Sequence, residues 1–166
     1  MPNPVLSPAP DGNGARIVKR EHESSIGPGP YVMGASTLDG DRVLSAEGDE
    51  IGKIKDIMLD VHSGRIAYAV MSSGGRLGIG DKLLAIPWDA LTLDAVRKCF
   101  VLALPAEHVK NAPGFDKRHW PAMADRAWAT AVHGYYGRDP YWSIETALPG
   151  ESSRSEEPPE AGGVKL

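Results

Sequence analysis

Residues 65–73 read RIAYAVMSS, and this stretch decides the fold class of the chain. Ile66, Tyr68 and Val70 fall on one parity, and three further apolar residues fall on the other, which is the alternation typical of a β-strand. The second set is mostly small, as expected where a neighbouring element packs closely. The preceding residues, His62-Ser63-Gly64, predict a tight turn into the strand.

Five more short strands are predicted on either side of this one. Turn signals recur between them about every eight to twelve residues, and no long helix interrupts the series. The sequence therefore predicts a sandwich or a barrel instead of a parallel α/β sheet. The five segments are Val43–Leu44, Ile51–Val61, Lys82–Trp88, Ala90–Val96 and Lys98–Leu104.

The segment Ile51–Val61 changes its apolar parity part of the way along. Ile54 and Met58 lie on one parity, whereas Ile57 lies on the other. This change predicts a β-bulge or a strong twist, which a closing barrel requires. Asp56 falls in the middle of the strand, where we expect it to accept backbone hydrogen bonds inside the bulge.

The second half of the chain changes from strands to helices. Residues 105–111 suit a short helix, and Pro121 is well placed in the first turn of a longer helix that runs to about Tyr136. Apolar residues recur every four positions along it and predict one broad apolar stripe, with His133 among the polar residues of the other face. The stripe comprises Trp120, Ala124, Trp128, Val132 and Tyr136.

The two ends of the chain differ from the middle in composition. Nine of the 14 prolines lie in residues 1–30 and 149–166, which are polar and without periodicity. Such segments bury too little apolar surface to offset the entropy of ordering, so both are predicted to be flexible tails, the second of them acidic. The folded part then divides into a β-barrel at 31–104 and a helical, aromatic-rich extension at 105–148. We expect the extension to pack on the barrel or on a second subunit.

The composition of the chain argues against several classes of function. The net charge of −4 and the pI of 5.7 count against nucleic-acid binding, which usually needs a clustered basic surface. The single cysteine, Cys99, permits no internal disulfide and no cysteine-pair metal site. No apolar stretch approaches the roughly 20 residues that span a bilayer, and the N-terminus has no signal-peptide pattern. We therefore expect a cytoplasmic protein without a membrane span.

Several separated segments of the chain resemble the PRC-barrel domain family, in its stand-alone bacterial branch. They occur in the family's order and extend over about residues 34–118. The resemblance implies a mainly β chain with a small six-stranded barrel, followed here by the short C-terminal helical extension. The segments are GDEIGKIKD at 48–56, GRIAYAV at 64–70, GGRLGIGDK at 74–82, AIPW at 85–88 and APGFD at 112–116.

The same family includes the cytoplasmic domain of the photosynthetic reaction centre H subunit and the C-terminal domain of a ribosome maturation factor. The resemblance therefore implies a module that docks on larger assemblies and has no family-wide catalytic site. This chain has neither the membrane helix of the H subunit nor the N-terminal domain of the maturation factor. Only the fold and the docking habit carry over from the resemblance.

A glycine-rich loop begins at residue 74, and its context argues against phosphate binding. A phosphate-binding loop needs glycines directly before the N-terminus of a helix, whereas the residues from Leu83 to Trp88 look like a strand. We interpret the loop as structural, with glycines that supply positive φ angles. These glycines are Gly74, Gly75, Gly78 and Gly80.

The polar side chains form no recognisable catalytic or metal-binding motif. No two histidines have the spacing of metal ligands, and no serine lies in a nucleophile elbow. A cluster of carboxylates is interpreted as a solvated rim. The sequence therefore predicts no catalytic residues, no metal and no cofactor. The clustered carboxylates are Glu47, Asp49, Glu50, Asp56 and Asp60.

Aromatic residues concentrate in the extension. Seven of the 11 aromatic residues lie between Phe115 and Trp142, and Trp and Tyr are enriched at protein interfaces. A small barrel has little outer surface to spare for them, so we predict a homodimer with the extension at or across the interface. The candidate interaction residues are Trp120, Trp128, Tyr135, Tyr136, Tyr141 and Trp142.

These features favour a non-catalytic interaction or assembly-associated module that binds a second copy of itself and a protein partner. Association with RNA or the ribosome is the alternative, and it requires a basic face. A small-molecule or metal-binding enzyme is the third hypothesis, which a deep polar pocket would distinguish.

Overall fold

The computed structural model describes residues 5–7, 15–19, 32–74 and 82–143, which form a mainly β structure with two α-helices near the C-terminal end. Two single turns of 3-10 helix, η1 (Ala35–Thr37) and η2 (Trp88–Ala90), join strands. The strands are β1 (Val5–Ser7), β2 (Arg16–Lys19), β3 (Arg42–Leu44), β4 (Glu50–Asp60), β5 (Arg65–Ser73), β6 (Lys82–Pro87), β7 (Leu91–Asp94) and β8 (Cys99–Leu102). The helices are α1 (Ala106–Lys110) and α2 (Arg126–Tyr135).

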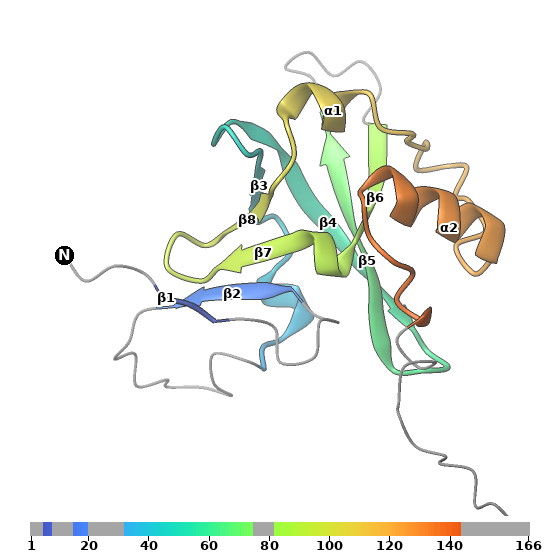
Figure 1. Ribbon diagram of the computed structural model, residues 1–166, viewed down its shortest axis with the longest axis horizontal. Helices are drawn as coiled ribbons and strands as arrows, with labels where there is room; N and C mark the ends of the chain where they lie inside the picture. The colour runs from blue at the N-terminus through green and yellow to red at the C-terminus, as the bar shows by residue number, and fades with distance from the viewer. Residues whose placement is uncertain (1–4, 8–14, 20–31, 75–81, 144–166) are drawn as a thin grey trace, which may run out of the picture.

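Strands β3 to β8 are the six strands that the sequence predicts. They follow the order β7-β8-β3-β4-β5-β6 in one strongly twisted sheet (Figure 1). The pairing of β3 with β8 is parallel, and the other four pairings among these strands are antiparallel. Within the described residues no ladder joins β6 to β7, so the six strands form an incompletely closed barrel.

Strands β1 and β2 extend the sheet beyond the six predicted strands. Arg16 to Val18 of β2 pair in parallel with Thr92 to Asp94 of β7, and β1 pairs with β2 at the edge of the sheet. Neither strand is predicted from the sequence, because each has only three or four residues within a proline-rich region. The prediction of a flexible tail at 1–30 thus overlaps two short paired segments.

Strand β5 is buried on both of its faces. The side chains from Tyr68 to Met71 are between 0% and 1% exposed. On one face Tyr68 lies against α2, where its ring centroid is 5.6 Å from that of Trp128. Because both faces are covered, β5 forms the centre of the molecule, as Figure 1 shows.

The irregularity that the sequence predicts in the strand Ile51–Val61, which is observed as β4, is confirmed. The register of β4 against β5 shifts between Ile54 and Asp56, and again between Met58 and Leu59. At the first shift the Asp56 carboxylate accepts a hydrogen bond from the backbone amide of Ile57 at 2.8 Å, as expected for a bulge. These bulges let one long strand bend around the core.

A glycine allows β4 and β5 to approach closely beside this first bulge. A Cβ atom at Gly52 would overlap the backbone oxygen of Ser72 and the side chain of Met71. Any larger residue at this position would force the two strands apart. The core beneath them includes Ile54 and Phe100, both fully buried.

The extension follows the sequence prediction in part. The predicted helix at 105–111 is confirmed as α1. The predicted start of the long helix at Pro121 is wrong, because α2 begins five residues later at Arg126. Asp125 is the reason: its carboxylate accepts hydrogen bonds from the amides of Ala127 at 2.7 Å and Trp128 at 3.1 Å, which makes it the N-cap of α2.

The turn between β7 and β8 depends on a buried carboxylate. Asp94 accepts hydrogen bonds from the backbone amides of Val96 and Arg97, and from the Arg97 guanidinium at 2.6 Å. Burial alone would raise the pKa of Asp94, but these hydrogen bonds outweigh burial and lower the pKa. Lys98 ends the turn with a positive φ of 51°.

We expect Asp94→Asn to lower the free energy of unfolding at neutral pH by about 2 kcal/mol, the range for hydrogen bonds to a charged group. Because the pKa of Asp94 is lowered in the folded state, the ionised carboxylate stabilises the fold above its unfolded pKa of about 3.9. That contribution is lost as the pH falls through the folded value. Urea titrations from pH 7 to pH 3 should therefore show the difference from wild type shrinking with acidification.

Asp39→Asn is the matched control, because Asp39 is exposed and makes none of these hydrogen bonds. Equal free energies of unfolding for wild type and Asp94→Asn at pH 7 would contradict this role of Asp94. A difference that is as large at pH 3 as at pH 7 would also contradict it.

Candidate interaction surface

Tyr68 on β5 is the residue on which the extension is anchored. Its ring lies 5.6 Å from Trp128, 5.3 Å from His133 and 6.2 Å from Tyr141, measured between ring centroids. The contact with Tyr141 is edge-to-face, with an interplanar angle of 88°. Such contacts are favourable beyond the apolar area that they bury. One strand residue thus holds both α2 and the segment that follows it.

The placement of His133 corrects the sequence analysis. Helical periodicity assigns it to the polar face of the helix, but it is only 1% exposed. Its Nδ1 atom lies 2.8 Å from the carbonyl oxygen of Ala129, and its ring packs against Tyr141 and Trp142 as well as Tyr68. The cause is the segment after α2, which folds back over the helix face that periodicity predicts to be exposed.

The last described segment lies along the end of the β4–β5 hairpin. The Arg65 guanidinium donates a hydrogen bond to the carbonyl oxygen of Tyr141 at 3.1 Å. Trp142 packs on His133 at 5.8 Å between ring centroids, and the Arg126 guanidinium lies over its ring at 5.4 Å. Tyr141 and Trp142 therefore make contacts within their own chain and remain only partly exposed.

Tyr135 and Tyr136 connect α2 to α1 and to the core. The Tyr135 hydroxyl donates a hydrogen bond to the carbonyl oxygen of His108 at 2.8 Å, and the two rings stack at 4.5 Å. Tyr136 is 5% exposed, and burial raises the pKa of its hydroxyl. Both predicted interaction residues are therefore occupied in packing the extension.

Trp120 is the one predicted interaction residue that is largely exposed. It does not lie on α2, contrary to the predicted stripe, because the helix begins only at Arg126. Its indole nitrogen donates a hydrogen bond to the carbonyl oxygen of Lys117 at 2.9 Å, and its ring leans on Phe115. The side chain is nevertheless 44% exposed.

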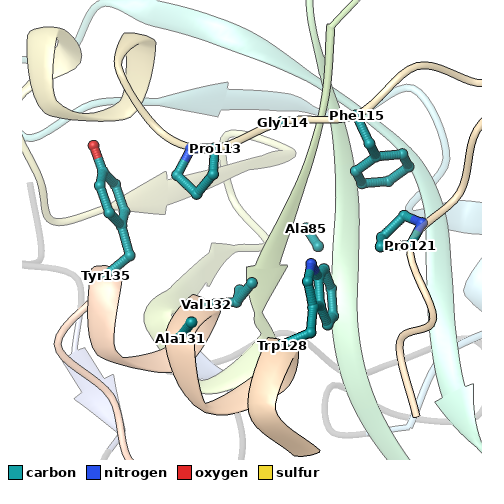
Figure 2. A pocket seen from close by; sticks show the side chains of 9 residues that line it. All are labelled: Ala85, Pro113, Gly114, Phe115, Pro121, Trp128, Ala131, Val132 and Tyr135. Atoms are coloured by element: carbon teal, nitrogen blue, oxygen red, sulfur yellow. The ribbon is translucent and has the colours of Figure 1, made fainter. Parts of the chain in front are cut away.

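An apolar groove of about 390 Å³ lies between α2 and the chain that connects α1 to α2 (Figure 2). We call it the α2 groove. Trp128, Val132 and Tyr135 rise from the helix, and Phe115 faces them from the connecting chain (Figure 2). Ala85 of β6 lies between the two walls, and the remaining lining residues are Pro113, Gly114, Pro121 and Ala131.

A second apolar surface lies at the end of the β4–β5 hairpin. Leu59 is 54% exposed and Val61 is 88% exposed. Tyr141 and Trp142 are beside this end of the hairpin, since the backbone of Tyr141 is bound by Arg65. We call these four residues the hairpin surface. Two exposed apolar side chains on the hairpin, next to a segment with two partly exposed aromatic residues, make this end of the molecule a candidate contact surface.

The glycine-rich loop is described only at its first residue. Gly74 is exposed at the end of β5, and Gly75, Gly78 and Gly80 lie outside the described residues. A strand, β6, follows the loop, as predicted, and not the helix that phosphate binding requires. Across the parts of the chain that the structure describes, no three His, Cys, Asp or Glu side chains are grouped so as to hold a metal ion.

The carboxylate cluster consists of exposed or partly exposed residues with local structural roles. Glu47 accepts a hydrogen bond from the amide of Ala106, at the start of α1. Asp60 accepts hydrogen bonds from His62 and Ser63 in the hairpin turn, and the Ser63 hydroxyl holds the pKa of Asp60 below its usual value. These contacts agree with the interpretation of the cluster as a solvated rim.

One carboxylate lies apart from that cluster, next to the aromatic packing. Burial raises the pKa of Asp89 in η2, and the nearby Arg138 and His133 partly oppose the increase. Arg138 also donates its backbone amide to the carbonyl oxygen of His133 at 2.9 Å, which fixes the turn after α2. Asp89 thus belongs to the packing between η2 and the extension.

These features define a small, incompletely closed β-barrel with a helical extension. The family model of the PRC-barrel domain matches residues 31–109, a range that contains all six barrel strands. This match supports the assignment of residues 31–109 to the PRC-barrel family, as the sequence motifs indicate, and α2 lies beyond the match. No curated protein matches the chain. No helix among the described residues is long and apolar enough to cross a membrane.

The hydroxyl of Tyr68 is buried without a hydrogen-bond partner among the described residues, and burial raises its pKa. A buried polar group without a partner is destabilising, so Tyr68→Phe should raise the free energy of unfolding by about 1 kcal/mol. Thermal melting of the two proteins measures the difference.

Tyr135→Phe is the matched control, because it removes a hydroxyl that does donate a hydrogen bond, to His108. We expect it to lower stability. A lower stability of Tyr68→Phe would show instead that the Tyr68 hydroxyl is satisfied, for example by a buried water molecule.

Proposed function

We propose that this chain is a non-catalytic interaction module that works as a homodimer through the hairpin surface. The exposure of Leu59 and Val61 carries this proposal, since these are the two most exposed large apolar residues of the region beside Tyr141 and Trp142. A twofold axis near the hairpin would place the same surface of each copy in contact.

The non-catalytic part of the proposal is supported by the PRC-barrel domain itself and by the role of each polar side chain. Asp94, Asp60 and Glu47 are engaged in turns and helix termini. The α2 groove is lined by apolar and aromatic residues, which supply no acid, base or nucleophile beyond the Tyr135 hydroxyl.

Most of the aromatic residues of the extension have a structural role. Trp128, Tyr136 and Tyr141 pack on their own barrel. The surface proposed for self-association is therefore smaller than the aromatic content of the extension suggests, and it includes residues of the barrel itself.

Replacing both exposed hairpin residues, Leu59→Ser with Val61→Ser, should weaken self-association. Burial of one Leu or Val side chain contributes about 1.5–3 kcal/mol, so the dimer Kd should rise more than about tenfold. Light scattering over a concentration series measures the change. Val32→Ser is the matched control, because Val32 is also exposed, at 65%, and lies outside the hairpin surface. A wild-type chain that is monomeric at tens of micromolar would refute the dimer.

Trp142→Ala tests the contribution of the extension to the same surface. We expect weaker self-association or partner capture while the barrel stays folded, because Trp142 is only partly buried and packs on His133 and Arg126 of α2. Far-UV circular dichroism reports the fold, and light scattering reports association. Trp120→Ala is the control, since Trp120 is an exposed tryptophan that packs on Phe115 and does not belong to the hairpin surface. Unchanged association with intact stability would contradict the role of Trp142.

A further inference from the structure

We propose that the α2 groove binds the proline-glutamate segment Glu156–Glu160 (EEPPE) of the same chain. The groove is apolar and open, and its lining includes three aromatic and two proline side chains. The inference is independent of the proposed dimer, which uses a different surface.

The chemistry of the groove favours a proline-rich peptide. Polyproline II segments bind in grooves lined by aromatic side chains, because their conformation is formed in advance and their rings pack flat. Phe115, Trp128 and Tyr135 supply three aromatic rings around one groove of about 390 Å³. Tyr135 is fixed by its hydrogen bond to His108, and Trp128 by its contact with Tyr68, so two of the rings are held in place before a peptide binds.

Trp128 also provides a hydrogen-bond donor. Its side chain lines the groove, and Figure 2 shows the indole nitrogen at the end of the ring nearest Ala85. Proline residues leave their carbonyl groups free to accept hydrogen bonds. A peptide in the groove can therefore pair one carbonyl oxygen with Trp128.

Charge selects the acidic proline segment over the other proline-rich parts of the chain. Residues 110–126, which contribute four residues to the groove lining, carry four Lys and Arg against two Asp. Asp116 is paired with Arg118, and Asp125 caps α2. Lys82 adds a further cation, since its side chain packs on Gly114 and its Nζ reaches the carbonyl oxygen of Lys110. Glu156–Glu160 carries three carboxylates and no cation, whereas the prolines of residues 1–10 have no charged neighbours in that stretch.

The segment is also close enough to reach the groove. The described chain ends at Ser143, next to Trp142 and two positions after Tyr141. Tyr68 contacts both Tyr141 and Trp128, so only one ring separates Tyr141 from the groove wall. Pro158 follows Ser143 by 15 positions, and an extended chain of this length spans roughly 45 Å at about 3.1 Å per residue.

Paramagnetic relaxation in the full-length chain tests the proposal. A spin label on Ser155→Cys would lie directly before the acidic segment, and Cys99 would not compete for the label because it is fully buried. A short tether gives an effective concentration of the order of 1 mM, which makes even a weak site substantially occupied. We expect at least a ~twofold loss of amide peak intensity at Gly114, Phe115 and Ala131, relative to the reduced label.

Two variants of α2 separate binding from non-specific proximity. Ala131→Glu places a carboxylate in the groove, and it should abolish the intensity loss. Thr130→Glu adds the same charge one residue away, at an exposed position that does not line the groove, and it should leave the loss intact. Replacing Pro158 and Pro159 together by Ala should also remove the loss, whereas replacing Pro8 and Pro10 by Ala should not.

Three results would overturn the proposal. The first is full intensity at the groove in the labelled wild-type chain. The second is an intensity loss that persists in Ala131→Glu. The third is a loss that appears only when labelled chains are mixed with isotope-enriched unlabelled chains, which would make a second copy the occupant in place of the same chain.

Discussion

The burial of β5 on both faces is the constraint on which the rest of the structure depends. One face belongs to the barrel core, and the other carries Tyr68, which is 1% exposed. A sheet face that bears such a ring must be covered, because leaving a large apolar side chain in water costs about 1.5–3 kcal/mol. Helix α2 and Tyr141 provide the cover. The extension therefore completes the fold of a barrel whose family match ends before α2 begins.

Local patterns in the sequence predict the barrel well. The bounds of β5 match the prediction, and the parity change in the preceding strand correctly indicates bulges. Both successes have the same physical origin: alternation and its interruption are properties of a few neighbouring residues. The family motifs extend this prediction from a sandwich or barrel to a six-stranded barrel, which alternation alone does not determine.

Contacts between distant parts of the chain explain where the sequence analysis fails. Helical periodicity assigns His133 to solvent because it cannot include Tyr141 and Trp142, which return over that face. Pro121 is compatible both with a helix start and with the non-helical segment that is observed. Only the hydrogen bonds made by Asp125 place the start of α2 at Arg126. The parallel pairing of β2 with β7 joins residues more than 70 positions apart, and short segments carry no local signal for it.

The aromatic residues of the extension are consequently divided between holding the fold and offering surface. Tyr136 serves the first purpose, and Trp120 stays exposed. Trp128 serves both purposes, since its ring contacts Tyr68 on the inside and lines the α2 groove on the outside. Any occupant of the groove therefore touches a side chain that also anchors the extension. Binding there and stability of the α2 packing are linked through this single ring, because whatever binds only the folded state stabilises it.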